Sequence, residues 1–246
     1  MADRVALITG GARRVGAAIS RQLHAAGVDL MLHYRRSSAE AHQLQEELNA
    51  LRAQSVALVQ ADLLNIATLP SMVSETIRHF GRLDVLVNNA SSFFPTSIGE
   101  ITEREWEDLV GTNLKTPLFL SQAAAPHLKR TQGCIVNIVD IHADRPMRNH
   151  LVYSVAKGGL LALTRALASE LGPDIRVNGV SPGIIMWPED ERWSDEVARQ
   201  RLVQSTLLKR VGDPEDVART VRFLVFDAPY ITGQIIAVDG GRSINL

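Results

Sequence analysis

The sequence predicts one α/β domain, built on a doubly wound parallel sheet of about seven strands with helices on both faces. Short apolar runs alternate with longer amphipathic stretches along the 246 residues, which is the pattern of strands joined by crossover helices. The apolar runs are nearly unbroken, as expected for strands buried on both sides. There is no internal repeat or low-complexity tract, so we expect residues 1–246 to form a single domain.

The predicted elements follow one another in regular order. Strands are predicted over residues 5–9, 29–34, 55–60, 83–88, 134–139, 175–180 and 234–238. Helices are predicted over residues 14–26, 39–52, 67–79 and 151–171. Gly27 is suited to the C′ position that ends the first helix. Two more helices begin at caps: Thr102 and Glu105 form a capping box, and Asp213-Pro214 is an N-cap and N1 pair.

The composition narrows the class of protein. A formal net charge of −1 provides no general attraction to nucleic acid or to anionic membranes. The single cysteine, Cys134, excludes an internal disulfide framework and fits a reducing compartment. No basic-then-apolar leader opens the chain, and no apolar run approaches the roughly 20 residues that span a bilayer. We therefore expect a cytoplasmic protein without a membrane or nucleic-acid partner.

A glycine-rich turn joins the first strand to the first helix. Its sequence is Thr9-Gly-Gly-Ala-Arg-Arg-Val-Gly16. Glycines permit a tight turn and close backbone approach, and the helix N-terminus favours a pyrophosphate. In this strand–turn–helix context the turn predicts dinucleotide binding by a Rossmann-type sheet. The cofactor contacts expected from the turn are Gly10, Arg13, Arg14 and Val15.

The end of the second strand predicts which dinucleotide is bound. NAD-binding proteins commonly place a carboxylate here, whereas this chain has Tyr34-Arg-Arg-Ser-Ser38. Two guanidiniums and two hydroxyls would satisfy a 2′-phosphate; a solvated basic turn is the alternative. The sequence therefore favours NADPH over NADH, with contacts from Tyr34, Arg35, Arg36 and Ser37.

Two further strand ends carry candidate cofactor residues. Asp62-Leu63 follows the third strand, where Asp62 either meets the adenine amino group or caps the next turn. Asn88-Asn89-Ala90 follows the fourth strand at the crevice. The small side chains of Asn89 and Ala90 would let the backbone run close to the cofactor ribose.

Tyr153 and Lys157 are four residues apart on a predicted helix, so both side chains lie on one face. A neighbouring ammonium lowers the pKa of a phenol toward working pH, which would allow Tyr153 to donate a proton. Asp140 stands thirteen residues before Tyr153, where a carbonyl reductase usually has a serine. The alternative for Asp140 is a loop carboxylate unrelated to catalysis.

Together these motifs resemble the short-chain dehydrogenase/reductase family over essentially the whole chain. Asn113, Pro182-Gly183 and the late Tyr230-Ile-Thr-Gly and Val238-Asp-Gly-Gly segments add to the resemblance. The usual family turn has glycine where this chain has Arg14. The chain is similar to pteridine reductases at four places. These are Arg14, the end of the second strand, Asn89-Ala-Ser-Ser-Phe93 and Asp140.

The resemblance implies roles for the matching residues. Arg14 would contact the pyrophosphate and reach toward the substrate, Ser91 would bind cofactor phosphate or substrate, and Phe93 would stack on a pterin; core packing is the alternative for Phe93. The implied catalytic group is Asp140, Tyr153, Lys157 and Asn113. The implied cofactor contacts further include Ser91, Tyr153, Lys157, Pro182, Gly183 and Ile184. The implied substrate contacts are Arg14, Ser91, Phe93, Asp140 and Tyr153. Ile184-Ile185 departs from the pattern, because a small polar residue is expected there.

Asp140 also indicates the kind of substrate. An ionised carboxylate would repel the negative charge that develops on a ketone oxygen, but it suits ring N–H groups or a C=N nitrogen that gains a proton. We therefore predict NADPH-dependent reduction of a dihydropterin or dihydrofolate. The proton would come through Tyr153, alone or with Asp140 and water. Lys157 would hold the nicotinamide ribose, and Asn113 would hold a water beside it.

Two other functions remain open from the sequence. One is a general carbonyl or 3-oxoacyl reductase on the same fold, and the other is a non-catalytic NADPH sensor. We predict no metal site, because no pair among His142, Asp144 and His150 has metal-ligand spacing with a convincing third partner. We expect a substrate lid around residues 183–210 and, by resemblance, a homotetramer.

Overall fold

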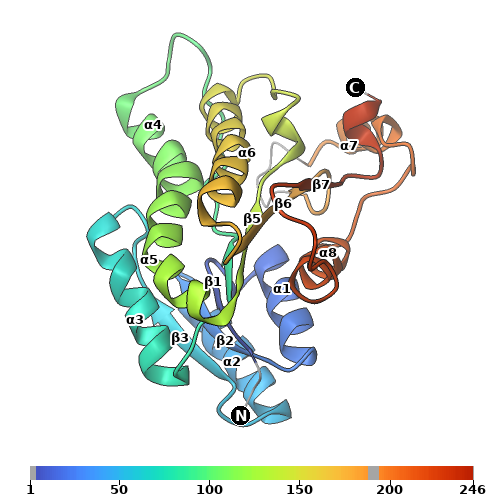
Figure 1. The fold of residues 1–246 in the computed structure, drawn as a ribbon. Helices are drawn as coiled ribbons and strands as arrows, with labels where there is room; N and C mark the ends of the chain where they lie inside the picture. The colour runs from blue at the N-terminus through green and yellow to red at the C-terminus, as the bar shows by residue number, and fades with distance from the viewer. Residues whose placement is uncertain (1–3, 188–193, 246) are drawn as a thin grey trace.

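The computed structural model describes residues 4–187 and 194–245. Seven strands form one sheet in the order β3-β2-β1-β4-β5-β6-β7, and every neighbouring pair is parallel. The predicted doubly wound fold is therefore confirmed (Figure 1). The strands are β1 (Arg4–Ile8), β2 (Val28–Tyr34), β3 (Val56–Gln60), β4 (Val85–Asn88), β5 (Cys134–Ile138), β6 (Arg176–Pro182) and β7 (Ile235–Val238).

Helices connect the strands, and their predicted caps are present. The helices are α1 (Arg14–Ala25), α2 (Ser38–Leu51), α3 (Leu69–Phe80), α4 (Glu103–Val110), α5 (Thr116–Thr131), α6 (Leu151–Leu171), α7 (Glu196–Ser205) and α8 (Pro214–Phe226). Short elements are the 3₁₀ helices η1 (Ile66–Thr68), η3 (Ile141–Ala143) and η5 (Arg242–Ile244) and the π-helix η2 (Gly111–Lys115). Thr102 and Glu105 form the predicted capping box of α4. Asp213 caps α8, and Gly27 follows α1 with φ of +89°.

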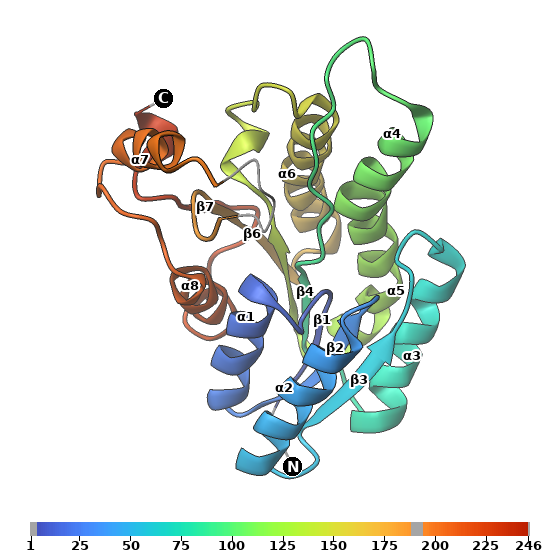
Figure 2. The same ribbon diagram turned by 180° about the vertical axis from the view of Figure 1, so that it is seen from behind.

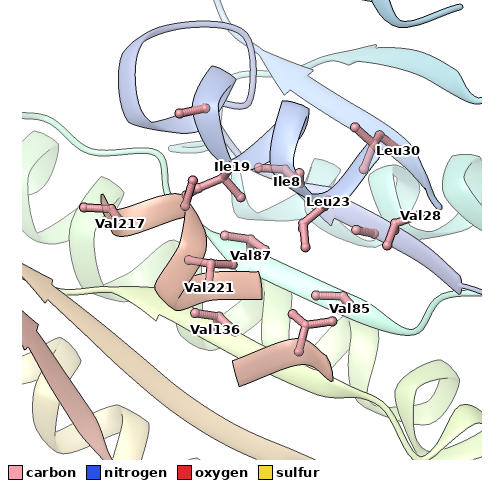
Figure 3. Close-up of a cluster of buried hydrophobic side chains, with 14 of the residues drawn as sticks. Ile8, Ile19, Leu23, Val28, Leu30, Val85, Val87, Val136, Val217 and Val221 are labelled. Atoms are coloured by element: carbon pink, nitrogen blue, oxygen red, sulfur yellow. The ribbon is translucent and has the colours of Figure 1, made fainter. Parts of the chain in front are cut away.

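The helices form a layer on each face of the sheet (Figures 1 and 2). One core packs the sheet against α1, α2 and α8, and Figure 3 shows its centre. The other core packs the opposite face against α3, α5 and α6. Successive residues of β1 alternate between the two: Ala6 and Ile8 belong to the first core and Leu7 to the second. Both faces of each central strand are thus buried, which explains the unbroken apolar runs.

The direction of winding reverses between β1 and β4. From β1 the chain builds outward through β2 and β3, and from β4 it builds the other way through β5, β6 and β7. β1 pairs with β4 over three residue pairs, whereas it pairs with β2 over five. The carboxyl ends of β1 and β4 therefore border the crevice where open α/β sheets bind ligands.

Helix α6 corrects one expectation from the sequence. By length and composition, Leu151–Leu171 is apolar enough to cross a membrane, so the prediction that no apolar run approaches that length was wrong. In the structure α6 packs on the sheet, with Leu160, Thr164 and Leu167 buried. A helix inside an α/β core has the same composition as a membrane span, because its neighbours are equally apolar.

The segment predicted as a lid is partly described. Residues 188–193 of the predicted 183–210 lie outside the described residues. After them comes α7, capped by the Asp195 side chain, which accepts hydrogen bonds from Val197 N and Ala198 N. Ile185, where a small polar residue was expected, belongs to the first core. Its apolar side chain is therefore explained by packing, and the function of the segment as a lid stays a prediction.

Candidate functional site

A cavity of about 760 Å³ lies over the carboxyl ends of the strands. Every site residue predicted from the sequence lines it except Asn113. Several other residues also line the cavity, although they were not predicted as site residues. They include His33, Ser92, Thr112, His142, Met147, Met186, Trp187, Leu202 and Arg242.

The glycine-rich turn is held against the end of β4. Thr9 Oγ1 accepts hydrogen bonds from the backbone N of Asn89 (2.9 Å) and of Ala90 (3.0 Å). Asn89 Nδ2 donates to the carbonyl oxygens of Thr9 (2.9 Å) and Gly10 (3.0 Å). A Cβ on Gly10 would lie 3.1 Å from Ala90 Cα, so glycine lets the turn pack closely against the end of β4. This cradle fits the pyrophosphate of a dinucleotide.

His33 also fixes this turn. Its Nδ1 accepts a hydrogen bond from Gly10 N at 3.1 Å, and its Nε2 lies 3.1 Å from the Ala61 carbonyl oxygen. Nε2 must therefore carry the ring proton. Burial lowers the pKa of His33 to about 4, although the hydrogen bond to Ala61 opposes the shift. The ring is thus a neutral acceptor near pH 7, and it connects β2 and β3 to the turn.

Arg14 occupies a strained position. Its φ is +52°, in the left-handed region that favours glycine, which explains why glycine is usual there. Arg14 Nη2 donates to the carbonyl oxygen of Trp187 at 3.1 Å. The Trp187 ring in turn lies under the Arg199 guanidinium of α7, 5.2 Å from the ring centroid. Arg14 therefore links the turn to the segment after β6.

The predicted 2′-phosphate end of the cavity is basic and exposed. Arg35 forms an ion pair with Asp62 at 2.9 Å. Asp62 Oδ1 also accepts a hydrogen bond from Leu64 N at 3.2 Å. Asp62 therefore caps the turn after β3, which was one of the two predictions for it. Among described residues, none forms an ion pair or hydrogen bond with the Arg36 side chain. Arg36 therefore keeps its positive charge available at this end of the cavity.

Asp140, Tyr153 and Lys157 meet in the middle of the cavity. Tyr153 OH donates to Asp140 Oδ2 at 2.8 Å, and Asp140 Oδ1 accepts from His142 N at 2.8 Å. Asp140 thus caps η3 as well as binding the phenol, and its catalytic role stays a prediction. Lys157 is 2% exposed, and its Nζ donates to the Ile138 carbonyl oxygen at 2.9 Å.

The charges of this group differ from the prediction. Burial raises the pKa of Tyr153 well above its usual value, and Asp140 adds to the rise by its charge and its hydrogen bond. The prediction that Lys157 would lower that pKa was wrong, because the Lys157 ammonium lies 5.7 Å from the ring centroid while the carboxylate touches the hydroxyl. Burial also lowers the pKa of Lys157 to about 8, although Asp140 opposes the shift. At neutral pH the group is a protonated phenol beside an ammonium ion.

Phe93 lies beside Tyr153 with part of its side chain exposed. Its ring stacks on His150, with centroids 4.7 Å apart and planes at 15°. It meets Tyr153 edge to face, with centroids 4.8 Å apart. The side chain remains 38% exposed and lines the cavity, so core packing alone does not account for it. An exposed aromatic face here suits a flat heterocycle.

Asn113 supports the cavity wall from behind. It sits in the π-helix η2, a rare geometry that often marks functional sites. Its Nδ2 donates to the carbonyl oxygens of Leu109 and Ser92, both at 2.9 Å. Its Oδ1 accepts from Ser91 Oγ at 2.6 Å. These contacts hold the loop that carries Ser91 and Phe93, and a direct catalytic role for Asn113 stays a prediction.

Among the described residues, no group of three or more His, Cys, Asp or Glu side chains is arranged to hold a metal ion. The ionisable groups of the cavity are instead mostly basic. They suit a multiply charged anionic cofactor better than a cation.

Comparison with known proteins identifies relatives over the whole chain. Residues 10–243 match the family described as enoyl-(acyl carrier protein) reductase, of the short-chain dehydrogenase/reductase class. Pteridine reductase 1 of Leishmania tarentolae is 40% identical over 98% of this chain and 96% of its own. The 3-oxoacyl-[acyl-carrier-protein] reductase FabG of Staphylococcus aureus is 37% identical over 96% of both chains. A putative ketoacyl reductase of granaticin synthesis from Streptomyces violaceoruber is 36% identical over 98% of this chain and 96% of its own.

Proposed function

Because this chain belongs to the short-chain dehydrogenase/reductase family of nicotinamide-dependent oxidoreductases, we propose that it reduces a C=N bond of a dihydropterin or dihydrofolate with NADPH. The observation that carries the proposal is the hydrogen bond from Tyr153 OH to Asp140 Oδ2, 2.8 Å long. A carboxylate beside the proton donor is unsuited to a developing ketone oxyanion. It accepts hydrogen bonds from ring N–H groups, which pterins offer.

The aromatic surface beside Asp140 supports a flat substrate. The partly exposed ring of Phe93 lines the cavity, and His150 stacks on it. A bicyclic heterocycle placed on this ring would bring its nitrogen edge toward Asp140 and Tyr153. Arg14 and Ser91, which also line the cavity, would complete the substrate site.

The basic end of the cavity supports NADPH as the cofactor. Arg36 and Ser37 would hold the 2′-phosphate, because Arg35 is engaged with Asp62 and Arg36 forms no ion pair with a described residue. Gly10, Asn89 and the start of α1 would hold the pyrophosphate. The remaining predicted cofactor contacts border the same cavity.

The residues perform separate parts of the reaction. When bound, NADPH supplies the hydride that adds to the ring carbon. Tyr153 gives its hydroxyl proton to the ring nitrogen, and its raised pKa means that the phenol is protonated before transfer. Lys157, whose ammonium lies 5.7 Å from the Tyr153 ring centroid, would hold the nicotinamide ribose. Asp140 orients the phenol before transfer and holds the ring by its N–H groups.

One panel of substrates tests the proposal. NADPH oxidation is followed at saturating cofactor with dihydrobiopterin, dihydromonapterin, dihydrofolate, acetoacetyl thioester and a simple ketone. We expect turnover of at least one pterin or folate and much weaker turnover of the thioester and the ketone. The variant Asp140→Ser should lose pterin reduction selectively.

The second candidate is a carbonyl or 3-oxoacyl reductase, which the 37% identity to the Staphylococcus aureus protein favours. Turnover of acetoacetyl thioester without turnover of pterins would replace our proposal with this function. Cofactor binding without oxidation of NADPH by any member of the panel would indicate a non-catalytic sensor.

A further inference from the structure

Arg242 is a cavity residue that the proposed mechanism does not use. It is the first residue of η5, directly after β7, and only 9% of it is exposed. Its backbone is firmly placed: the Asp239 carboxylate accepts hydrogen bonds from Gly241 N at 2.9 Å and Ser243 N at 2.7 Å. The following Asn245 side chain donates to the Ser205 carbonyl oxygen at the end of α7, and Figure 1 shows this terminus beside α7.

The guanidinium of Arg242 lacks hydrogen-bond partners in the part of the chain that the structure describes. Its Nε is buried without an acceptor, and no side-chain hydrogen bond or ion pair of Arg242 is present there. Asp140 and Asp239 act on it through their charges only. A buried, unsatisfied charged donor is costly. Because Arg242 lines the cavity, a molecule bound there can supply the missing acceptor.

The position of Arg242 excludes the 2′-phosphate as that acceptor. Arg36 follows β2, whereas Arg242 follows β7, at the far edge of the sheet. Five strand spacings separate the two, on the order of 24 Å. Arg242 instead lies on the side of Asp140, because Arg145 Nε, in the loop after η3, donates to the Ser243 carbonyl oxygen next to Arg242 at 3.2 Å. Its acceptor therefore belongs to the substrate end of the cavity.

The charges at that end favour an anion. Asp140 is already engaged by Tyr153 OH and His142 N, while the ammonium of Lys157 is a second cation in the same region. The planar fork of an arginine matches the two oxygens of a carboxylate. A neutral hydroxyl would satisfy one donor but would leave the buried charge uncompensated.

We infer that Arg242 binds a carboxylate carried on the substituent of the substrate ring, and so selects carboxylate-bearing substrates over neutral ones. The inference deepens the proposed function and rests on it. A dihydrofolate offers such a carboxylate, and a dihydropterin with a hydroxylated side chain does not. Arg242 is thus a specificity residue, separate from Asp140, Tyr153 and Lys157.

The test compares two substrates on three variants. Arg242→Gln keeps hydrogen-bond donors without charge, Arg242→Lys restores the charge, and Arg148→Gln removes an exposed charge, before α6, that does not line the cavity. For Arg242→Gln we expect the KM for dihydrofolate to rise about 10- to 100-fold, as for loss of a charged hydrogen bond. The KM for dihydrobiopterin and for NADPH should change less than about twofold, because neither would lose a charged hydrogen bond to Arg242. Arg242→Lys should recover part of the loss, and Arg148→Gln should behave as the unaltered protein.

Equal rises of KM for both substrates, or no rise for either, would overturn the inference. Thermal melting and NADPH titration of each variant show whether it is folded. Failure of the proposed function is a separate result, in which the unaltered protein oxidises no NADPH with any pterin. In that case the equilibrium binding of folic acid decides: equal affinity of the unaltered protein and Arg242→Gln overturns the inference, and weaker binding to the variant supports it.

Discussion

At the scale of single residues, the catalytic group shows how burial can reverse an electrostatic expectation. The sequence places an ammonium one helical turn from Tyr153, yet the carboxylate of Asp140 is the group that touches its hydroxyl. A phenol with a raised pKa is protonated at neutral pH but is a weaker proton donor than a free phenol. The site without ligand therefore holds the proton that a reduction needs, but not the pKa that favours its release.

Replacing Tyr153 tests this role directly. Tyr153→Phe keeps the aromatic edge that contacts Phe93 and removes only the hydroxyl. We expect kcat to fall by about 10²- to 10⁴-fold, the usual contribution of a general acid. NADPH should still bind, as measured by fluorescence titration. Turnover equal to that of the unaltered protein would eliminate Tyr153 as the donor.

Lys157 predicts a characteristic dependence on pH. Its pKa is lowered from 10.5 to about 8, so it is a cation below pH 8 and loses its charge above. We expect kcat/KM for NADPH, which reports the free protein, to fall about tenfold per pH unit above that value. Because the folded state disfavours the ammonium, the free energy of unfolding should rise between pH 8 and 10.5. Activity and stability should therefore change in opposite directions; a parallel fall of both would contradict this assignment.

Arg36 predicts the cofactor preference. Arg36→Asp places a carboxylate where the 2′-phosphate of NADPH would lie, and the two negative groups would repel each other. The ribose hydroxyls of NADH can instead donate hydrogen bonds to that carboxylate. We expect the Kd for NADPH to rise at least about 100-fold and the Kd for NADH to fall or stay constant. Isothermal titration with both cofactors measures the ratio, and Arg104→Asp, at an exposed position that does not line the cavity, is the control. Equal weakening of both cofactors would defeat the assignment.

Residue types and spacing predicted most of the residues that line the cavity. Each motif follows the carboxyl end of a strand, and in a parallel sheet these ends lie along the same edge. The residues missed have no such signature. His33 lies within the second strand, and its function depends on the Gly10 amide from which it accepts a hydrogen bond. Arg242 is separated from Asp140 by more than a hundred residues. The direction in which the pKa of Tyr153 shifts depends mainly on how deeply the phenol is buried. The spacing of residues in the sequence does not reveal that burial.

At the scale of elements, two helical glycines offer a matched comparison. A Cβ on Gly16 in α1 would lie 2.1 Å from the Gly10 carbonyl oxygen, whereas a Cβ on Gly158 in α6 would meet nothing closer than 3.5 Å. Gly16→Ala should therefore destabilise the protein by about 1–3 kcal/mol and weaken NADPH binding. Gly158→Ala should stabilise it by up to about 1 kcal/mol. Urea unfolding and NADPH titration of both variants check this; equal behaviour would contradict it.

The elements themselves were mostly predictable. Alternating apolar runs located every strand to within two residues, and caps at Thr102 and Asp213 located two helix starts. Several elements escaped prediction, among them the 3₁₀ helices, η2 and α7. The π-helix η2 adds one residue to a turn, and this leaves no mark on an otherwise helical pattern. Helix α7 has no buried residue, so it lacks the apolar stripe by which helices are recognised.

At the scale of the whole molecule, the outer face of α6 predicts an assembly. Leu151 and Val155, one turn apart, are 42% and 49% exposed, although most of the helix is apolar. We expect the 27.0 kDa chain to sediment as a tetramer with two-fold axes, as resemblance also suggests. Val155→Glu should reduce the particle size while circular dichroism stays unchanged. Sedimentation of the unaltered protein as a monomer would refute the assembly.

The short β1–β4 ladder has a consequence for the protein's behaviour in solution. With only three residue pairs, it is the shortest ladder of the sheet, and Thr9 and Asn89 reinforce it just beyond its end. A dinucleotide bound across this crevice would contact both the β1–β3 half and the β4–β7 half of the sheet. It would therefore strengthen a connection that few backbone hydrogen bonds provide. Amide deuterium uptake along β4 should therefore slow when cofactor is added, even though few of those amides lie near the added molecule.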